Sequence, residues 1–422
     1  MVAIRAMRAS RAATIPETAP TLATRFAAVR QRTLALCAPL SAEDHVVQAM
    51  ADASPAKWHL AHTTWFFETF VVPGAPFDPA FDFLFTSYYE AVGPRVERPR
   101  RGMLTRPALE RVHAYRAAVD HRVLRALDDD ALDDDARAIL ELGLHHEQQH
   151  QELILTDAKY LLGTQPLQPA YRALARAPAS EPEPLAWDAE PGGIVELGAD
   201  DRGFAFDNER PRHRVLLAPY ELASRPIANA EVLAFIADGG YRDHRLWLSD
   251  GWHVVKAEGW TAPLYWTERD GEPASYELAG VRTIDPGETA CHLSLYEADA
   301  IARWLGARLP SEAEWEHAAA PRALHGNFAD DDRLHPDRAV GAWAQLYGDV
   351  WEWTASSYSA YPGYRPLPGA LGEYNGKFMS GQHVLRGGSC FTPADHVRAT
   401  YRNFFPPGAR WQMTGVRLAR DA

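Results

Sequence analysis

Cysteine is scarce in this chain, which has three cysteines among its 422 residues. Cys37, Cys291 and Cys390 lie far apart, so their number and spacing predict neither a disulfide framework nor a cysteine-rich zinc site. Such a composition is typical of proteins from a reducing compartment, and we expect a cytoplasmic location.

Long apolar runs and an excess of positive charge are also missing. No stretch of about 18 apolar residues occurs, which predicts that the chain does not span a membrane. Lys and Arg number 43 against 56 Asp and Glu, giving a formal net charge of −13. Binding to nucleic acid or to an anionic membrane needs a basic surface, so we expect neither partner. The sequence leaves the oligomeric state open.

The N-terminal part of the chain has apolar residues at the spacing of long helices. We expect residues 1–20 to be a frayed or disordered terminus and residues 21–172 to form an all-α bundle. The four predicted helices cover residues 22–40, 54–70, 107–127 and 136–162. Four long helices joined by loops favour an antiparallel four-helix bundle.

The composition then changes. Residues 173–191 contain four prolines among small and acidic residues, which is typical of an interdomain linker. Residues 192–422 are richer in Gly, Pro and Trp, with short predicted helices at 297–305 and 312–319. This pattern favours a C-terminal α+β domain built from short strands and loops, and hence a multidomain chain.

A cluster of histidine, glutamate and glutamine lies on the last predicted helix of the bundle. Residues 145–152 read His-His-Glu-Gln-Gln-His-Gln-Glu. His146 and His150 are four residues apart, so their rings share one helix face. Imidazole is a good ligand for iron, zinc, copper and nickel, and two polar rings inside a bundle need partners. We therefore predict a metal site; the alternative is a solvated, histidine-rich surface.

Residues 146–150 also match the H-E-x-x-H pattern of zinc proteases. The extended form of that pattern is absent, because Leu153 stands in place of the glycine and Thr156 in place of the third histidine. We therefore disfavour a protease. The third ligand can come from another helix, where His59 and His62 both lie in the segment 58–68.

Taken together, these motifs resemble one family, the iron-dependent sulfoxide synthases of ergothioneine biosynthesis. The segments that carry the resemblance are 60–62, 87–90, 146–150, 308–316, 348–354 and 386–389. That family joins a DinB-like helical bundle to a domain similar to formylglycine-generating enzymes, which has a C-type-lectin-like core. The resemblance implies that Fe(II) is the cofactor and that His62, His146 and His150 are its ligands.

The resemblance also implies the substrates: hercynine, which is trimethylated histidine, O₂, and a thiol or selenol donor. The product would be a hercynine sulfoxide. The stretch 401–412 would line the substrate pocket. Aromatic side chains attract a fixed cation, and the polar neighbours would hold the carboxylate and the imidazole. The implied substrate-binding residues are Gln149, Asn403, Phe404, Phe405 and Trp411.

Tyrosines and arginines complete the expected site. A tyrosine hydroxyl is neutral at pH 7 yet can donate a proton. Residues 87–95 resemble the version of the family that places its catalytic tyrosines in the bundle domain, which implies Tyr89, then Tyr88, in that role. The alternative is a hydrophobic pair packed between the domains. Guanidinium groups bind carboxylates well, and Arg95, Arg98, Arg101 and Arg410 are the candidates for binding the sulfur donor.

Several alternatives stay open. The donor is cysteine or γ-glutamylcysteine, or else a selenosugar, as in the related selenoneine synthases; residues 380–383 and 412–413 differ from the commonest sulfoxide synthase pattern. Formylglycine-generating activity is disfavoured, because it needs a pair of copper-binding cysteines and Cys390 is the only cysteine in that region. A binding module whose metal has no catalytic role is a further alternative.

Overall fold

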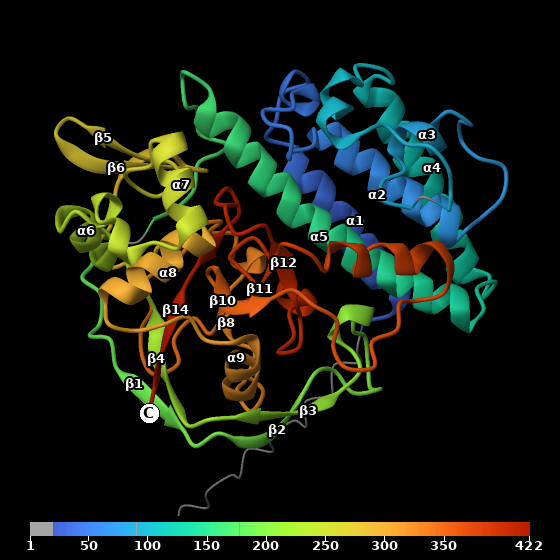
Figure 1. Ribbon diagram of the computed structural model, residues 1–422. Coiled ribbons are helices and arrows are strands. Elements are labelled where there is room, and N and C mark those ends of the chain that lie inside the picture. Colours follow the sequence, from blue (N-terminus) through green and yellow to red (C-terminus); the bar gives the residue numbers. More distant parts are fainter. Residues whose placement is uncertain (1–19, 90, 177) are drawn as a thin grey trace, which may run out of the picture.

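A computed structural model of the chain describes residues 20–89, 91–176 and 178–422. The predicted frayed terminus, except for residue 20, and Glu90 of the tyrosine motif lie outside the described residues. The chain forms an N-terminal helical bundle and a C-terminal domain of small sheets and short helices, as predicted (Figure 1).

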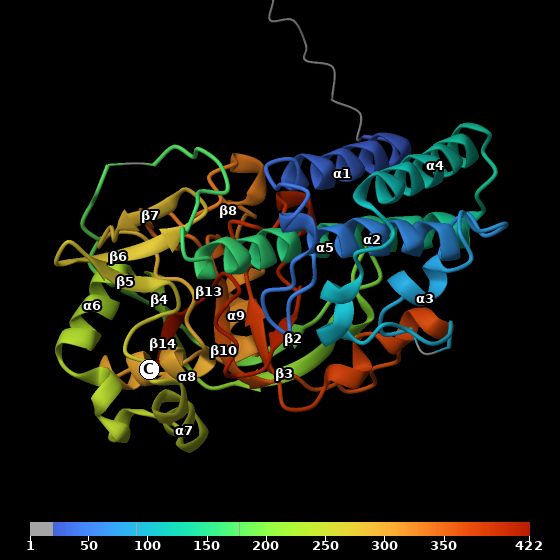
Figure 2. The same cartoon turned by 90° about the horizontal axis from the view of Figure 1, so that it is seen from above.

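The bundle contains the four long helices that the apolar spacing predicts. They are α1 (Leu22–Cys37), α2 (Ala56–Phe70), α4 (Leu109–Asp128) and α5 (Asp134–Thr164), and a short α3 (Phe81–Phe85) follows α2. Side-chain caps fix two of the starts, since Thr21 accepts a hydrogen bond from the Thr24 amide and Asp133 from the Ala136 amide. Helix α5 packs against both α1 and α2 (Figure 2).

The described part of the C-terminal domain contains five small sheets. The four-stranded sheet has the order β12 (Asn403–Phe405), β11 (His383–Arg386), β10 (Trp351–Ser357) and β13 (Thr414–Gly415). Strands β10 and β13 are parallel, and the other pairs in this sheet are antiparallel. The sheet places β12, whose residues carry part of the expected pocket, at its edge.

The remaining elements surround this sheet. The two three-stranded sheets are β1 (Trp187–Glu190), β4 (Tyr220–Pro226) and β14 (Arg417–Asp421), and β5 (Trp266–Arg269), β6 (Glu272–Glu277) and β7 (Gly280–Thr283). The two-stranded pairs are β2 (Gly193–Leu197) with β3 (His213–Leu217), and β8 (Gly326–Asn327) with β9 (Tyr347–Gly348). The helices are α6 (Asn229–Ala237), α7 (Ser249–Glu258), α8 (Leu295–Trp304) and α9 (Glu312–Ala319).

The end of the predicted linker belongs to the C-terminal domain. Strand β1 lies within residues 173–191, yet it pairs antiparallel with β4, and Trp187 stands opposite Ala223. Four residues of mixed polarity do not show a strand pattern of their own, so only the pairing reveals it. The irregular connection therefore ends at residue 186.

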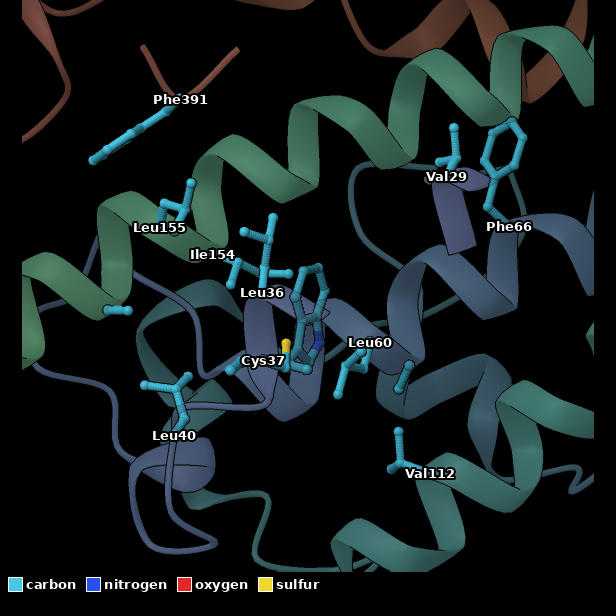
Figure 3. Packing of buried hydrophobic residues seen from close by; sticks show 14 of the residues in the cluster. Val29, Leu36, Cys37, Leu40, Leu60, Phe66, Val112, Ile154, Leu155 and Phe391 are labelled. Carbon is cyan, nitrogen blue, oxygen red and sulfur yellow. The ribbon is translucent and has the colours of Figure 1, made fainter. Parts of the chain in front are cut away.

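Helix α5 is buried between the two domains. One continuous hydrophobic cluster joins Leu36 and Leu60 of the bundle to Phe391 and Met413 of the C-terminal domain. Figure 3 shows Phe391 on one side of α5, with Leu36 and Leu60 on the other. The histidine cluster of α5 therefore lies where the two domains meet.

Within the described residues, no helix has both the length and the apolar character needed to cross a membrane.

Candidate metal centre and adjoining cavity

The residues His145 to Glu152 of α5 point in three directions. His146 and His150 face α2, while Glu147 and Gln151 face α1 and bond to its residues. The other four bond to the C-terminal domain: His145 to His396, Gln148 to Asp395, Gln149 to Tyr401, and Glu152 to Trp351, Ser389 and Thr392. One helical segment thus carries a possible metal site and the main polar contacts between the domains.

Three histidines converge at this point. The ligand atoms of His62, His146 and His150 all lie within 4.8 Å of one another, and their ring centroids are 4.6 to 5.0 Å apart. Burial lowers the pKa of His146 to about 4, and burial together with the neighbouring rings lowers the pKa of His62 and His150 well below the usual range. Neutral rings at pH 7 present the lone pairs that a metal ion requires.

Hydrogen bonds orient two of the three rings. His62 Nδ1 donates to the carbonyl of Phe85 at 2.6 Å, which leaves Nε2 as its ligand atom. His59 Nε2 donates to the Asp157 carboxylate at 3.1 Å, so His59 Nδ1 accepts the proton of His150 Nδ1 at 2.7 Å. His150 Nε2 is then unprotonated. Such outer hydrogen bonds fix the tautomer and the orientation of histidine ligands.

The residues fit a bound metal ion. His146 Nδ1 is buried and has no hydrogen-bond partner among the described residues, and a buried polar atom without a partner is costly. Three imidazoles are a suitable donor set for a divalent transition metal. Of the two histidines that the sequence leaves open, His62 joins the cluster, whereas His59 lies behind His150.

Glu147 has a structural environment that excludes the zinc-protease interpretation. Its carboxylate is fully buried and accepts hydrogen bonds from Arg30 at 2.7 Å, from Thr33 at 2.6 Å and from Arg116. Burial alone would raise the pKa of Glu147, but Arg116 and Arg30 hold it at about 2. A carboxylate paired with two arginines inside the bundle cannot reach a metal-bound substrate as a general base.

A cavity of about 340 Å³ lies between the bundle, including α5, and the C-terminal domain, and the three histidines are not among its lining residues. Gln149, which precedes His150, lines it, and so does Asp157, which bonds to His59. Its aromatic lining residues include Phe378, Phe404, Phe405 and Trp411, and its amide side chains are Gln149, Asn208, Asn375, Gln382, Asn403 and Gln412. The cavity therefore combines aromatic faces and amide groups with charged side chains of both signs, namely Asp52, Glu152, Asp157, Arg98 and Arg402.

Most of the predicted pocket residues reach this cavity. Those that line it are Tyr88, Arg98, Gln149, Asn403, Phe404, Phe405 and Trp411. One face of Phe404 is already covered, because its ring stacks on Tyr358 at a centroid distance of 4.0 Å. Asn403 Oδ1 accepts a hydrogen bond from the Phe404 amide, which leaves the amide nitrogen of its side chain for other contacts.

The two predicted tyrosines have different surroundings. Tyr88 lines the cavity and packs edge-on against Phe378 at a centroid distance of 5.1 Å. Tyr89 lies in the bundle core, with its ring 5.5 Å from both Trp65 and Phe70. Burial raises the pKa of Tyr89. The described cavity therefore includes Tyr88 among its lining residues, and not Tyr89.

Only one of the four predicted donor-binding arginines, Arg98, lines the cavity. Arg101 stacks on Trp58 at 3.4 Å and donates to the hydroxyls of Ser54 and Ser87. Arg95 contacts the Tyr88 ring at 5.1 Å and the Ser87 carbonyl.

Arg410 lies outside the cavity as well. Its guanidinium stacks on Trp260 at 4.1 Å and donates to Glu297 at 3.0 Å. The sequence showed the local positive charge of these arginines but not the partners that hold each one.

Tyr374 and Asn208 line the cavity without having been predicted from the sequence, whereas Tyr401 and Gln412 belong to the stretch 401–412 that was expected to line the pocket. Tyr374 comes from an irregular glycine-containing segment without helix or strand periodicity, and burial raises the pKa of its hydroxyl. Asn208 and Gln412 are buried, and their carbonyl oxygens have no hydrogen-bond partner among the described residues. Tyr401 bonds to Gln149 at 2.8 Å. The aromatic and amide content of these segments was the only indication available.

Comparison with known proteins matches both domains. Residues 189–345 and 340–422 match the Sulfatase-modifying factor enzyme 1-like domain, and residues 25–154 match the DinB superfamily. The fold and the histidine cluster thus define a two-domain protein with a DinB-like bundle and a sulfatase-modifying-factor-like domain.

Similar proteins of known name indicate which family of such two-domain proteins the chain belongs to. The chain is 35% identical to "Hercynine oxygenase" of Mycolicibacterium thermoresistibile, over 87% of this chain and 87% of that protein. It is 34% identical to "Hercynine oxygenase" of Mycobacterium tuberculosis, over 95% of this chain and 98% of that protein. "Ergothioneine biosynthesis protein 1" of Schizosaccharomyces pombe is 26% identical, over 52% of this chain and 28% of that protein. The chain belongs to the sulfoxide synthase family of ergothioneine biosynthesis, which confirms the predicted family.

Proposed function

We propose that this protein is a non-haem Fe(II)- and O₂-dependent enzyme that joins a thiol sulfur to the imidazole C2 carbon of hercynine, giving a hercynine sulfoxide. The observation that carries this proposal is the convergence of His62, His146 and His150 beside a cavity with aromatic and amide walls. Relatives whose printed name is hercynine oxygenase support the choice of acceptor.

The three histidines would hold the iron. When bound, Fe(II) would activate O₂ and bring the reactants together. The protein contributes neutral rings held in place by Phe85 and by the His59–Asp157 pair. These contacts fix the lone-pair directions before any ligand arrives.

The cavity walls suit hercynine. Its trimethylammonium group carries a fixed charge, and aromatic faces attract such cations; Phe405 and Trp411 are the lining residues offered for it. Gln149 lines the cavity and precedes His150 in the sequence, and it would hold the imidazole. Two arginines line the cavity, Arg98 and Arg402. Arg402 is paired with Glu312, so Arg98 would take a carboxylate.

A tyrosine hydroxyl in the cavity would supply the proton that the reaction needs. Tyr88 and Tyr374 both line the cavity, and their ring centroids are 6.2 Å apart. Burial raises the pKa of Tyr374, so its hydroxyl stays protonated at neutral pH and can donate. Tyr89 stays the residue expected from the sequence, and single phenylalanine variants of the three tyrosines separate them.

A second candidate is the selenoneine synthase reaction, which forms a C–Se bond from a selenosugar. Two observations favour it. Arg95, Arg101 and Arg410 do not line the cavity, and Arg402, which does, is paired with Glu312, so fewer cations than expected face a donor carboxylate. The buried carbonyl oxygens of Asn208 and Gln412 lack partners among the described residues and would accept hydrogen bonds from sugar hydroxyls.

Mass spectrometry of the products tests the proposal. The protein is loaded with Fe(II), mixed with hercynine in air, and offered cysteine, γ-glutamylcysteine or a selenosugar in parallel. A hercynine sulfoxide identifies the sulfur reaction and its donor. A selenium adduct formed only from the selenosugar would show that the protein catalyses the selenoneine synthase reaction instead. No adduct from any donor, with iron bound, would overturn both and favour a binding module without catalysis.

A further inference from the structure

A chain of hydrogen bonds runs from the cavity into the interface between the domains. Gln149 Nε2 donates to Tyr401 Oη at 2.8 Å, and the same oxygen lies 3.0 Å from His396 Nε2. His396 Nδ1 then lies 2.8 Å from His145 Nδ1. Only Gln149 has so far been given a role in the site, so the purpose of the other three residues is open.

These three residues are almost completely shielded from water. His396, His145 and Tyr401 are 0%, 3% and 4% exposed. The His145 ring stacks on Phe204 at a centroid distance of 3.9 Å. No carboxylate bonds to either ring within the described residues. The nearby Arg398 is paired with Glu209. Burial without a counter-ion keeps both histidines neutral, with one ring proton each.

The geometry allows one arrangement of protons once the Gln149 amide is placed. Tyr401 Oη accepts the Gln149 proton, so its own proton goes to His396 Nε2. His396 must then carry its ring proton on Nδ1. Two Nδ1 atoms at 2.8 Å share one proton, so His396 donates to His145, which carries its proton on Nε2. The reverse order requires Gln149 to turn its carbonyl oxygen toward Tyr401.

We propose that His396 is a positioning residue, which acts through Tyr401 to keep the carbonyl oxygen of Gln149 turned toward the cavity. This inference rests on the proposed function, because it assigns that oxygen to the ring N–H of the imidazole acceptor. The site then selects a neutral imidazole that still has a ring N–H, and it discriminates against an acceptor methylated on that nitrogen.

The tautomers can be measured without any substrate. In the full-length protein labelled with ¹⁵N-histidine, the ring nitrogen shifts and one-bond couplings report which nitrogen carries the proton, and His396→Gln and His145→Gln variants assign the signals. The expected result is an Nδ1–H tautomer for His396 and an Nε2–H tautomer for His145. The opposite pair of tautomers would overturn the proposal, and it would do so even if hercynine is not the substrate.

The second test compares His396→Phe, which removes the acceptor for the Tyr401 proton, with His396→Gln, whose amide oxygen can accept it. His213→Phe is the matched control, since His213 bonds to the Pro211 carbonyl and packs on Tyr361 within the C-terminal domain. Hercynine binding to the Fe(II)-loaded protein is measured anaerobically by calorimetry. The preference for hercynine over its ring-N-methyl analogue is measured as a ratio of kcat/KM.

We expect His396→Phe to weaken hercynine binding about 10-fold and to lower the preference by a similar factor, the usual effect of losing one hydrogen bond. His396→Gln should recover most of both, and His213→Phe should change neither. An equal loss for both acceptors, with an unchanged preference, would show a purely structural role. If the wild type binds no hercynine, the proposed function fails, and the tautomer measurement still decides the arrangement of protons.

Discussion

Two histidines about one helical turn apart on α2, His59 and His62, make different contacts. His62 meets His146 and His150 with its ligand atom, and its other nitrogen donates to Phe85. His59 has both nitrogens occupied, one by His150 and one by Asp157. The first is therefore expected to bind the metal directly, and the second to orient a ligand.

Because of this difference, replacing His62 should weaken metal binding more than replacing His59. We expect His62→Ala to lose stable metal binding, whereas His59→Ala weakens the affinity roughly 10–100-fold, the usual effect of removing an outer hydrogen-bond partner. Titration of the purified proteins against a competing chelator measures both, and His113→Ala, at an exposed position of α4, is the control. Wild-type affinity in His62→Ala would show that the cluster is not the metal site.

At the scale of the element, α5 depends on close approach to its neighbours. A Cβ atom on Gly143 would lie 2.6 Å from Phe67 Cε1 and 2.9 Å from Phe66 Cε1, both on α2. The small residue therefore sets how closely the two histidine-bearing helices pack.

We expect Gly143→Ala to destabilise the protein by about 1–3 kcal/mol, because overpacking outweighs the roughly 1 kcal/mol by which alanine favours a helix over glycine. Urea unfolding gives the change in free energy, and a chelator titration shows whether the altered spacing also weakens metal binding. A more stable variant would mean that the helices separate at little cost.

Glu147 predicts how the same helix responds to acid. Its pKa is held at about 2 in the folded protein, against an ordinary value of 4.5. A lowered folded pKa stabilises the fold above the ordinary value, and this stability is lost as the pH falls toward 2. The shift corresponds to about 3 kcal/mol.

The test is urea unfolding of Glu147→Gln and the wild type at a series of pH values. At pH 7 the variant should be less stable by about 3–5 kcal/mol, because Arg116 stays buried without its salt-bridge partner and Arg30 keeps only Asp120. Between about pH 4.5 and 2 its unfolding free energy should fall less steeply than that of the wild type. Parallel curves would show that Glu147 does not titrate as described.

At the scale of the whole molecule, the two domains share one interior. The hydrophobic cluster that contains Leu36 and Leu60 continues to Phe391, and Glu152 of α5 accepts hydrogen bonds from Trp351 and Thr392. Neither domain therefore buries α5 without the other.

Unfolding should accordingly be cooperative. We expect helix content, tryptophan fluorescence and metal release to change at the same urea concentration, since α5 is helical, contacts Trp351 and carries two of the clustered histidines. A transition in which fluorescence changes first while the helical signal persists would show that the bundle is stable alone.

The sequence predicted the parts of this molecule that have a local pattern. Helical spacing placed the four long helices within a few residues, and the motif that ends at His150 indicated a histidine cluster on the last of them. It did not reveal β1, nor the bond between Gln149 and Tyr401, whose partners are 252 residues apart. Contacts of that range come from short irregular segments, in which no periodicity indicates which side chain meets which.

The arginines illustrate the same limit. Their clustering indicated positive charge near the site, but Arg101 turns to Trp58 and Ser54 while Arg98 lines the cavity. Only the tertiary structure decides which guanidinium faces the cavity, since all of these arginines lie in connecting segments or loops.

The most direct test of the central claim is the rate of O₂ consumption by the Fe(II)-loaded protein. We expect O₂ consumption to require hercynine and a sulfur or selenium donor together, and to disappear in His62→Ala. Rapid consumption without hercynine, or none with both substrates while iron is bound, would contradict the claim that the three histidines and the adjoining cavity form an active site for oxidative bond formation.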